Sequence, residues 1–397
     1  MGGPVRLIIL QGTPFCNIDC RYCYLPDRDT KARIAPAVVD ALARKLVYER
    51  MLDGSVEICW HAGEPLTVPI LEYESLIGIL NEGLKGVAKP QYSVQTNATL
   101  ITPKWCEFFS KHSIRVGVSL DGPLAIHDVC RVDRAGKGTH ARVMQGVRLL
   151  QEYGIEPYVI AVLHRESLQR PDEMFSFFQS TGVPEICFNM EEIEGINSRS
   201  SLDYPGVRAD AERFFRRYFE LISTTPGSHW LREFAHTLRR LCARKVNNAQ
   251  IKPFEILTVD HRGNYSTFSP ELHGVHTPRY PRFTLGSVFD EEPSFEQSVA
   301  GAPILLKEIG AGIDLCRSEC PYFEVCGGGA PSNKVAENGL LGSSETLNCR
   351  LGVQAPIDAM LSLFGERISQ LASSAEVLSE AWAGAASISP TEVISIS

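Results

Sequence analysis

The most constraining feature of the sequence is an alternation of β-rich runs and amphipathic segments over its first half. Each β-rich run is short, apolar and bounded by Gly, Pro or Asn, which is typical of buried strands. The runs cover residues 5–11, 56–63, 92–98, 115–122, 157–163 and 185–190. Between them apolar residues recur at helical spacing, as at Ile34, Val38, Leu42 and Leu46. Six such repeats predict an α/β fold with a parallel sheet closed or half-closed into a barrel, and chemistry at the carboxyl ends of its strands.

The pattern changes after about residue 200. Segments 207–222 and 229–245 have helical spacing and basic outer faces, so we expect two helices that bridge two domains. A hairpin pattern begins at residue 254, residues 356–374 predict a last helix, and the small polar residues 383–397 predict a mobile tail or a docked strand. The expected divisions are a barrel over 1–205, bridging helices over 206–250, a smaller domain over 251–365, and a helix end with a tail over 366–397.

Composition excludes several classes of protein. Hydrophobic residues make up 44% and charged residues 22% of the 397 residues, an ordinary globular mixture. The net charge is −8 and there is no basic run, so nucleic acid is not an expected partner. No stretch reaches the roughly 18 consecutive apolar residues that a membrane helix needs. We therefore expect a cytoplasmic protein without a membrane partner.

The twelve cysteines are distributed unevenly. Cytosolic thiols stay reduced, so metal or cluster ligation is favoured over disulfides. Three crowd the N-terminal region, Cys16, Cys20 and Cys23, and four crowd the C-terminal third, Cys316, Cys320, Cys326 and Cys349. Five lie singly beside apolar residues and are expected to be structural: Cys59, Cys106, Cys130, Cys187 and Cys242.

The N-terminal group is a C-x3-C-x2-C run placed just after the first predicted strand. Three thiolates on one tight loop can hold three corners of a [4Fe-4S] cube and leave the fourth iron open to a small molecule. Zinc is the alternative, but zinc usually takes four ligands, and His61 is the nearest candidate for a fourth.

This run, with the aromatic Tyr22 before its last Cys, resembles the motif of the radical S-adenosylmethionine (SAM) superfamily. The resemblance implies a partial (β/α)6 TIM-like barrel. It also implies that Gly63, Glu64 and Pro65 hold the amino group of SAM, with Ala62 in place of the family's first Gly. Strand-end residues are implied to contact the methionyl and ribose groups: Gln95, Thr96, Asn97, Ser119 and Asp121. Arg142 is the expected partner of the SAM carboxylate, with Arg131 as a second candidate.

The four C-terminal cysteines could saturate one [4Fe-4S] cluster. Their arrangement resembles the SPASM domain, a smaller iron-sulfur domain that follows many radical SAM barrels. The chain departs from the full pattern, because residues 263–269 contain no Cys and Ala330 follows the CGGG run. We therefore expect one auxiliary cluster rather than two, with a four-thiolate zinc site as the alternative.

The segments 13–28, 187–197 and 320–349 resemble the cyclophane-forming radical SAM/SPASM peptide maturases of the GrrM/OscB type. The resemblance implies a ribosomally synthesised precursor peptide with a leader as substrate, and a reducing partner such as flavodoxin or ferredoxin. Because the chain begins at the first strand, leader binding is expected on the barrel, on the 200–250 helices, on the auxiliary domain or on a separate partner. Alternatives are thioether formation, epimerisation, formylglycine formation, or a zinc-stabilised binding protein without catalysis.

The crosslinking reaction needs an acceptor for one electron and one for a proton. The auxiliary cluster is the expected electron acceptor. Glu191, Glu192 and Glu194 follow the sixth strand, and Asp260 lies in the predicted hairpin, so these are the candidate bases. The same carboxylates could instead bind a basic residue of the substrate or face solvent.

Overall fold

The computed structural model describes residues 4–242 and 247–373. Within them the strands form one ten-stranded sheet in the order β10-β9-β8-β1-β2-β3-β4-β5-β6-β7. Strands β1 to β8 are parallel to one another, and β9 and β10 are antiparallel additions at the β8 edge. The strand bounds are β1 Leu7–Leu10, β2 Gly54–Trp60, β3 Ala88–Thr96, β4 Arg115–Ser119, β5 Tyr158–Leu163, β6 Glu185–Met190, β7 Trp230–Leu231, β8 Ile256–Val259, β9 Asn264–Thr267 and β10 Gly286–Ser287.

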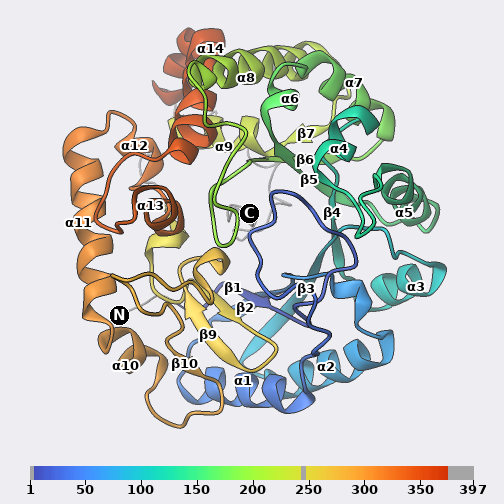
Figure 1. Cartoon of the computed structure of the whole chain (residues 1–397), viewed down its shortest axis with the longest axis vertical. Helices are drawn as coiled ribbons and strands as arrows, with labels where there is room; N and C mark the ends of the chain where they lie inside the picture. The colour runs from blue at the N-terminus through green and yellow to red at the C-terminus, as the bar shows by residue number, and fades with distance from the viewer. Residues whose placement is uncertain (1–3, 243–246, 374–397) are drawn as a thin grey trace.

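Helices cover the outer face of the curved sheet, and the elements α10 to α13 lie on the side where the arc of strands is open (Figure 1). The helix bounds are α1 Pro36–Tyr48, α2 Ile70–Gly83, α3 Pro103–His112, α4 Leu124–Cys130, α5 His140–Glu152, α6 Arg165–Leu168, α7 Pro171–Thr181, α8 Val207–Thr224, α9 Arg232–Cys242, α10 Phe295–Ala300, α11 Pro303–Glu319, α12 Phe323–Cys326, α13 Pro331–Asn338 and α14 Ala355–Ser373. A π-helical stretch, Cys349–Gln354, leads directly into α14.

The six predicted strands are confirmed as β1 to β6, with helices between them. All four residues of β1 are buried, as expected for a strand covered on both faces. Helix α1 begins with Pro36 in its first turn and buries Val38, Leu42 and Leu46 against the sheet, which confirms the predicted apolar face. The (β/α)6 part of the fold therefore follows from local sequence pattern.

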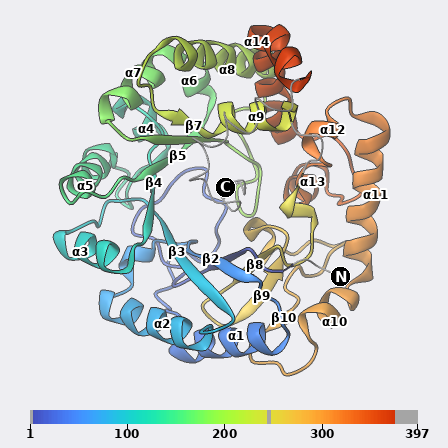
Figure 2. The same ribbon diagram turned by 180° about the vertical axis from the view of Figure 1, so that it is seen from behind.

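The predicted hairpin is confirmed as β8 and β9, but β8 does not start a separate sheet. It pairs in parallel with β1, in register from Leu7 with Ile256 to Leu10 with Val259. β1 would otherwise be an edge with open backbone groups, and β8 satisfies them. The view from behind shows the labels of β8 and β2 at this end of the sheet, with β1 between the two strands in the strand order (Figure 2). The sheet is thus continuous across the expected boundary at residue 251.

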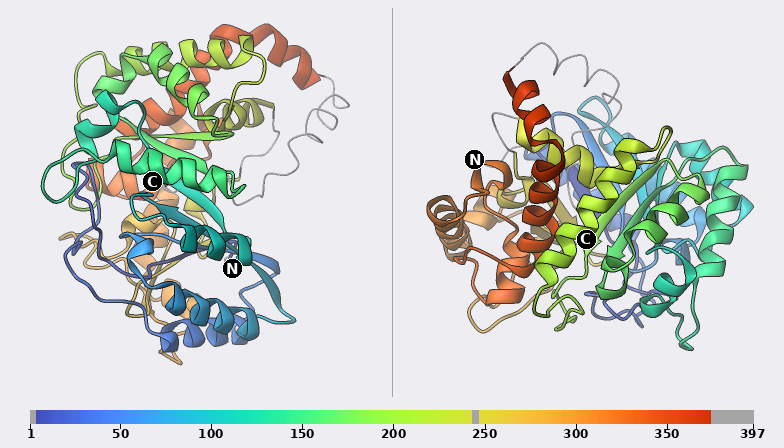
Figure 3. Two further views of the ribbon diagram at one scale, coloured as in Figure 1. Left: turned by 90° about the vertical axis from the view of Figure 1, so that its right-hand side faces the viewer. Right: turned by 90° about the horizontal axis from the view of Figure 1, so that it is seen from above.

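The region after the barrel differs from the prediction in one further place. Segment 229–245 was predicted as one helix, yet Trp230–Leu231 form β7 on β6, and α9 begins only at Arg232. The last predicted helix is confirmed as α14, which packs along α8 and α9 (Figure 3). Residues 243–246 and the predicted tail 383–397 lie outside the described residues. No helix of the described residues is long and apolar enough to cross a bilayer.

Candidate functional site

Three thiols converge on the loop that follows β1, at the carboxyl end of the barrel. Cys16, Cys20 and Cys23, called here the three-cysteine site, line a cavity of about 140 Å³ whose wall comes from the ends of β2 to β6. Hydrogen bonds from Asp19 N to Val132 O (2.8 Å) and from Arg21 N to Cys130 O (2.9 Å) tie the loop to the end of α4. Burial raises the pKa of the Cys16 and Cys20 thiols to about 12. These thiolates therefore need the positive charge of a bound metal.

The turn after β2 is built from backbone that approaches the three-cysteine loop closely. Gly63 has φ +78°, and a Cβ there would lie 2.2 Å from Thr13 O, so glycine is required. Ala62 also adopts a positive φ, 68°. Its own Cβ makes this conformation costly, which explains why the family's pattern has glycine there.

Glu64 is buried at this turn, and its carboxylate accepts three hydrogen bonds from the chain itself. Its Oε1 accepts from Thr96 Oγ1 (2.6 Å) and Leu66 N (3.0 Å), and its Oε2 accepts from Asn97 N (2.8 Å). Burial raises the pKa of Glu64 to about 7, against the lowering effect of these hydrogen bonds. Glu64 thus joins the end of β2 to the end of β3.

Arg131 stands at the centre of a buried charge network beside the thiols. Its Nε lies 2.9 Å from Asp121 Oδ1, and Asp121 Oδ2 accepts from the Tyr22 hydroxyl at 2.6 Å. Burial alone raises the pKa of Asp121, but Arg131, His127 and Tyr22 hold that pKa below its usual range. Nη1 of Arg131 approaches Cys20 Sγ at 3.8 Å, so the guanidinium also faces the three-cysteine site.

The structure separates the two arginine candidates. Arg131 lines the cavity and is 7% exposed. Arg142 does not line the cavity, and it pairs with Asp133 at 3.1 Å near the surface. The structure therefore places Arg131, the second candidate, at the cavity and Arg142, the first choice, outside it. Arg142 lies in the first turn of α5 and its side chain reaches Asp133 instead.

The remaining predicted SAM contacts divide between the cavity wall and the layer behind it. Gln95, Thr96, Asn97 and Ser119 line the cavity with Gly63 and Glu64. Pro65 begins a buried 3-10 turn behind the wall. The side chain of Gln95 donates to Ser119 Oγ at 3.0 Å, and its buried Oε1 has no hydrogen-bond partner. The cavity therefore offers three thiols for iron, an unpartnered acceptor on Gln95 and the guanidinium donors of Arg131. This set of groups fits an iron-sulfur cluster with bound SAM.

Two candidate carboxylates meet at the junction of the barrel with α13. Asn333 Nδ2 donates to Glu192 Oε2 at 2.6 Å and to Glu194 Oε1 at 3.0 Å. Burial raises the pKa of both glutamates, and the proximity of Glu192 raises that of Glu194 further. Both line the three-cysteine cavity. The pair therefore favours holding a proton next to the strand ends.

The other two candidate bases lie elsewhere. Glu191 turns away from the cavity and binds Ser201 N at 3.0 Å. Asp260 caps the β8–β9 turn by accepting from Arg262 N and Asn264 N, at 2.8 and 2.9 Å, and it pairs with His273. It lines a separate cavity on the other side of the β1 loop. The structure therefore places Glu191 and Asp260 outside the three-cysteine cavity, where both accept hydrogen bonds from loop residues.

The four C-terminal cysteines come together as well. Cys316, Cys320, Cys326 and Cys349, called here the four-cysteine site, line one cavity of about 310 Å³. Gly327, Gly328 and Gly329 follow Cys326 with φ of 77°, 114° and 73°. Three successive positive φ values favour glycine, and Gly328 and Gly329 line the cavity, with Gly328 O 3.8 Å from Cys316 Sγ. Four thiols around one cavity fit a fully ligated [4Fe-4S] cluster.

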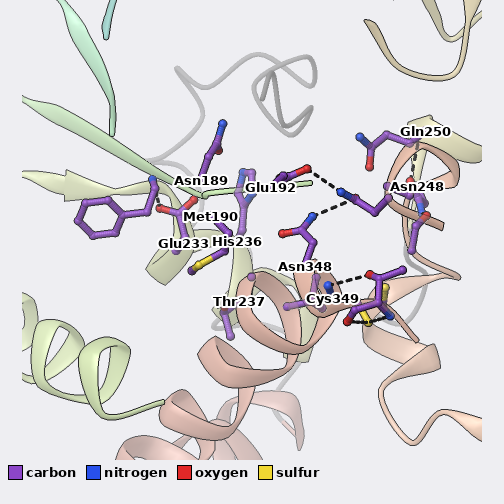
Figure 4. Close-up of a pocket in the computed structure, with 18 of the residues that line it drawn as sticks. Asn189, Met190, Glu192, Glu233, His236, Thr237, Asn248, Gln250, Asn348 and Cys349 are labelled. Atoms are coloured by element: carbon purple, nitrogen blue, oxygen red, sulfur yellow. Dashed lines mark hydrogen bonds between the residues drawn. The ribbon is translucent and has the colours of Figure 1, made fainter. Parts of the chain in front are cut away.

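A polar pocket of about 140 Å³, called here the junction pocket, lies between the two cysteine sites. It shares Asn189, Met190 and Glu192 with the three-cysteine cavity, and Cys326 and Cys349 with the four-cysteine cavity. Figure 4 shows Glu192, His236, Asn348 and Cys349 around it.

In residues 4–242 and 247–373, no three His, Cys, Asp or Glu side chains are close enough together to hold a single metal ion.

Sequence reasoning missed two residues of this region. Asn333 bridges the two glutamates and also accepts from Asn348 Nδ2 at 2.9 Å. Tyr24 lines the three-cysteine cavity, and its buried hydroxyl has no hydrogen-bond partner. Tyr24 follows Cys23 directly, so its place in the motif was an available signal. Asn333 had no local signal, because its role depends on how α13 docks.

Of the five scattered cysteines, Cys59, Cys106, Cys130 and Cys187 are buried, which confirms their structural interpretation. Cys242 is half-buried at the end of α9.

Comparison with known proteins agrees with this geometry. The sequence profile of the Radical SAM superfamily matches residues 10–178. An uncharacterized protein of Synechocystis sp. is 38% identical over 376 residues, covering 92% of this chain and 94% of that protein. The serine-type anaerobic sulfatase-maturating enzyme of Bacteroides thetaiotaomicron is 32% identical over 190 residues, covering 47% of this chain. That match spans 46% of the Bacteroides enzyme, about half its length.

Solved structures extend the likeness beyond the barrel. The structure of anSMEcpe with bound AdoMet and Cp18Cys peptide has a TM-score of 0.74 at 18% identity, covering 93% of this chain and 99% of that one. Streptococcus suis SuiB bound to S-adenosylmethionine has a TM-score of 0.59 at 14% identity, covering 87% and 77%. At these identities the likeness shows the fold, and the sequence comparison sets aside a non-catalytic zinc protein. The chain belongs to the radical SAM superfamily, enzymes that use SAM together with an iron-sulfur cluster.

Proposed function

We propose that this radical SAM enzyme oxidises a ribosomally made precursor peptide, joining an aromatic ring carbon to a β-carbon and closing a cyclophane. The observation that carries the proposal is the junction pocket, which is lined by residues of both cysteine cavities. A peptide segment there can face both sites at once. Two proteins of similar fold have been solved with peptides, anSMEcpe with Cp18Cys and SuiB with its precursor peptide SuiA.

The net reaction removes two hydrogen atoms from the peptide. When bound, SAM and the cluster on Cys16, Cys20 and Cys23 supply a 5′-deoxyadenosyl radical, and the cluster on the other four cysteines supplies an electron acceptor. One hydrogen atom leaves the β-carbon of the peptide and ends on 5′-deoxyadenosine. The β-carbon then bonds to the ring carbon, and the ring regains aromaticity by losing one electron and one proton. A flavodoxin or ferredoxin is the proposed source of the electron that starts each turnover.

Glu192 is the proposed proton acceptor. It is the candidate carboxylate that lines both the three-cysteine cavity and the junction pocket. Asn333 holds one of its oxygens at 2.6 Å. Burial raises the pKa of Glu192 above its ordinary range, so the carboxylate binds a proton more tightly than an exposed glutamate does.

Arg131, Gln95 and Gly63 are the proposed holders of SAM. The Nε side of Arg131 faces Asp121 at 2.9 Å and Nη1 faces Cys20 Sγ at 3.8 Å, so the guanidinium lies at the cavity where it can donate to a carboxylate. The free Oε1 of Gln95 can accept a hydrogen bond, and the backbone around Gly63 can approach the ligand without a side chain in the way. The surrounding wall excludes water from the radical.

Oxidation of a Ser or Cys residue to formylglycine is the second candidate. The similarity to sulfatase-maturating enzymes of both serine and cysteine type favours it. Cyclophane formation is preferred because the chain has four cysteines in its C-terminal domain, with none in 263–269 and Ala330 after the CGGG run. The products differ chemically, since formylglycine is an aldehyde and the cyclophane is a ring between two residues.

Co-expression with short precursor peptides from the same genetic neighbourhood tests the proposal. We expect a product that has lost two hydrogens, lacks fragment ions between the crosslinked residues and does not react with a hydrazide. A hydrazide-reactive product without such a gap establishes the formylglycine alternative, because oxidation of Ser to formylglycine also removes two hydrogens. The chain with Cys16→Ala, Cys20→Ala and Cys23→Ala is the matched control and should leave the peptide unchanged.

A further inference from the structure

Lys334 is a buried cation in contact with the four-cysteine site. It lies on α13 and is 3% exposed. Its Nζ donates to Gly312 O at 3.0 Å and to Cys316 Sγ at 3.4 Å. Among the hydrogen bonds and ion pairs of the described residues, none joins Lys334 to a carboxylate. Burying an ammonium group is costly unless a nearby negative charge compensates it.

Arg240 is a second cation near the same site. It lies on α9 and lines the junction pocket with Cys326 and Cys349. Burial lowers the pKa of Arg240, and Arg232 lowers it further, whereas a negative charge on Cys326 raises it. In the part of the chain that the structure describes, no carboxylate forms a close ion pair with Arg240; Glu233 pairs with Arg232 at 2.6 Å and raises the pKa of Arg240 only from a greater distance.

The cations at the three-cysteine site are compensated instead. Arg131 pairs with the buried Asp121 at 2.9 Å, and Arg28 pairs with Asp19 at 2.7 Å. Each of these cations has a carboxylate partner that offsets part of its charge, although Arg131 still lowers the pKa of Cys20 more than Asp121 raises it. Glu319 and Glu345 line the four-cysteine cavity, but among the described residues neither pairs with Lys334 or Arg240. The two cysteine sites therefore differ in how their cations are paired as well as in the number of thiols.

This difference bears on where an added electron is stabilised. The reduction potential of an iron-sulfur group depends on nearby charge and on hydrogen bonds to its sulfurs. A buried cation without a carboxylate partner stabilises the reduced, more negative state, because Coulomb interactions are strong in a low-dielectric interior. A hydrogen bond from Nζ to Cys316 Sγ acts in the same direction.

We propose that Lys334 and Arg240 are positioning residues that raise the reduction potential of the iron-sulfur group held by Cys316, Cys320, Cys326 and Cys349. They thereby make the four-cysteine site the electron acceptor of the pair. The inference rests on the proposed function for the direction of electron flow. The potential itself is a property of the protein that can be measured without any peptide.

Redox titration of the anaerobically reconstituted full chain, followed by electron paramagnetic resonance, tests the proposal. The background is the chain with Cys16→Ala, Cys20→Ala and Cys23→Ala, so that the remaining signal belongs to the four-cysteine site. We expect Lys334→Met to lower the equilibrium constant for one-electron reduction at least tenfold, which is a shift of 59 mV to lower potential. Arg240→Met should shift it in the same direction, and the double variant should shift it further.

Two control variants separate charge from structure. Lys334→Arg keeps the positive charge and should retain most of the parent potential. Lys307→Met removes a charge from an exposed position on α11 and should leave the potential unchanged. If Lys334→Met fails to bind iron, Arg240→Met decides the test.

An unchanged potential in the variants that retain the cluster overturns the proposal. An equal shift in Lys307→Met overturns it as well. Shifted potentials in an enzyme that makes no cyclophane would support the charge effect and refute the proposed reaction, so the two failures are distinguishable.

Discussion

The two cysteine sites present the same ligand atom in different surroundings. At the three-cysteine site, Arg131 is neutralised by buried Asp121, and the thiols face a cavity walled by the strand ends. At the four-cysteine site, Lys334 contacts Cys316 Sγ, and the described residues supply no carboxylate to it. Thiolate ligands alone therefore do not distinguish a site that injects an electron from one that receives it. What distinguishes the two sites is the charge of the neighbouring residues and the number of thiols, which leaves one iron open at the three-cysteine site and none at the four-cysteine site.

The largest expected effect comes from removing ligands at each site. Cys16→Ala should abolish both SAM cleavage and peptide modification, because the remaining two thiols cannot hold the SAM-binding cluster. Replacing Cys316 and Cys349 together by Ala should leave SAM cleavage measurable while abolishing the crosslinked product. Chromatography of 5′-deoxyadenosine and mass spectrometry of the peptide give the two readouts. Cys106→Ala, at a buried thiol remote from both sites, is the control.

Full crosslinking after loss of Cys316 and Cys349 would contradict the division of roles between the sites. The electron lost by the aromatic ring would then have to leave the peptide by another route.

The second prediction concerns Glu192, where the cavities of the two sites meet. Glu192→Gln should slow crosslinking by about 10²–10⁴-fold, the range for loss of a general base, while SAM cleavage changes little. Only the ionised carboxylate accepts a proton, so the crosslinking rate should rise with pH. Burial raises the pKa of Glu192 to about 7, which places the inflection above the range of an exposed glutamate. The Glu192→Gln variant should lose this inflection.

Glu191→Gln is the matched control for this test, because Glu191 binds Ser201 outside the cavity. Equal rate losses in the two variants would refute the assignment of Glu192.

The third prediction makes the three-cysteine site resemble the other one. Asp121→Asn keeps the shape of the side chain but leaves Arg131 as an uncompensated buried cation. Removing one partner of a buried pair costs about 3–5 kcal/mol, so the free energy of unfolding should fall by that order. In iron-loaded protein the potential of the three-cysteine site should move upward. Denaturant unfolding and redox titration measure the two effects.

Asp133→Asn breaks the solvent-facing pair with Arg142 and should change both quantities much less. If the two aspartate variants behave alike, burial of the Arg131–Asp121 pair has no special role.

Much of the barrel could be predicted because its pattern is local. The alternation of apolar runs and helical faces identified β1 to β6, and motif order located Gly63, Gln95 and the cysteines at their carboxyl ends. The pairing of β8 with β1 joins residues about 250 positions apart, so no local pattern signalled it. For the same reason, the sequence could not decide whether Arg131 or Arg142 lies at the cavity. Which of them faces the cavity depends on the backbone bonds between the cysteine loop and residues 130–132.

The smallest expected effects concern backbone conformation at the two sites. Ala62 adopts a positive φ beside the three-cysteine loop although it carries a Cβ. At the four-cysteine site the positive φ of 114° belongs to Gly328, which has no Cβ. Ala62→Gly removes the conformational cost of a Cβ but adds freedom to the unfolded chain, so it should raise the free energy of unfolding by at most about 1 kcal/mol. Gly328→Ala should lower it by about 1–3 kcal/mol, because the new Cβ is strained and would lie 3.1 Å from Ile313 Cγ1. Opposite signs in denaturant unfolding would confirm that backbone shape is optimised at one site and compromised at the other, whereas a loss of stability in Ala62→Gly would show that Ala62 is well accommodated.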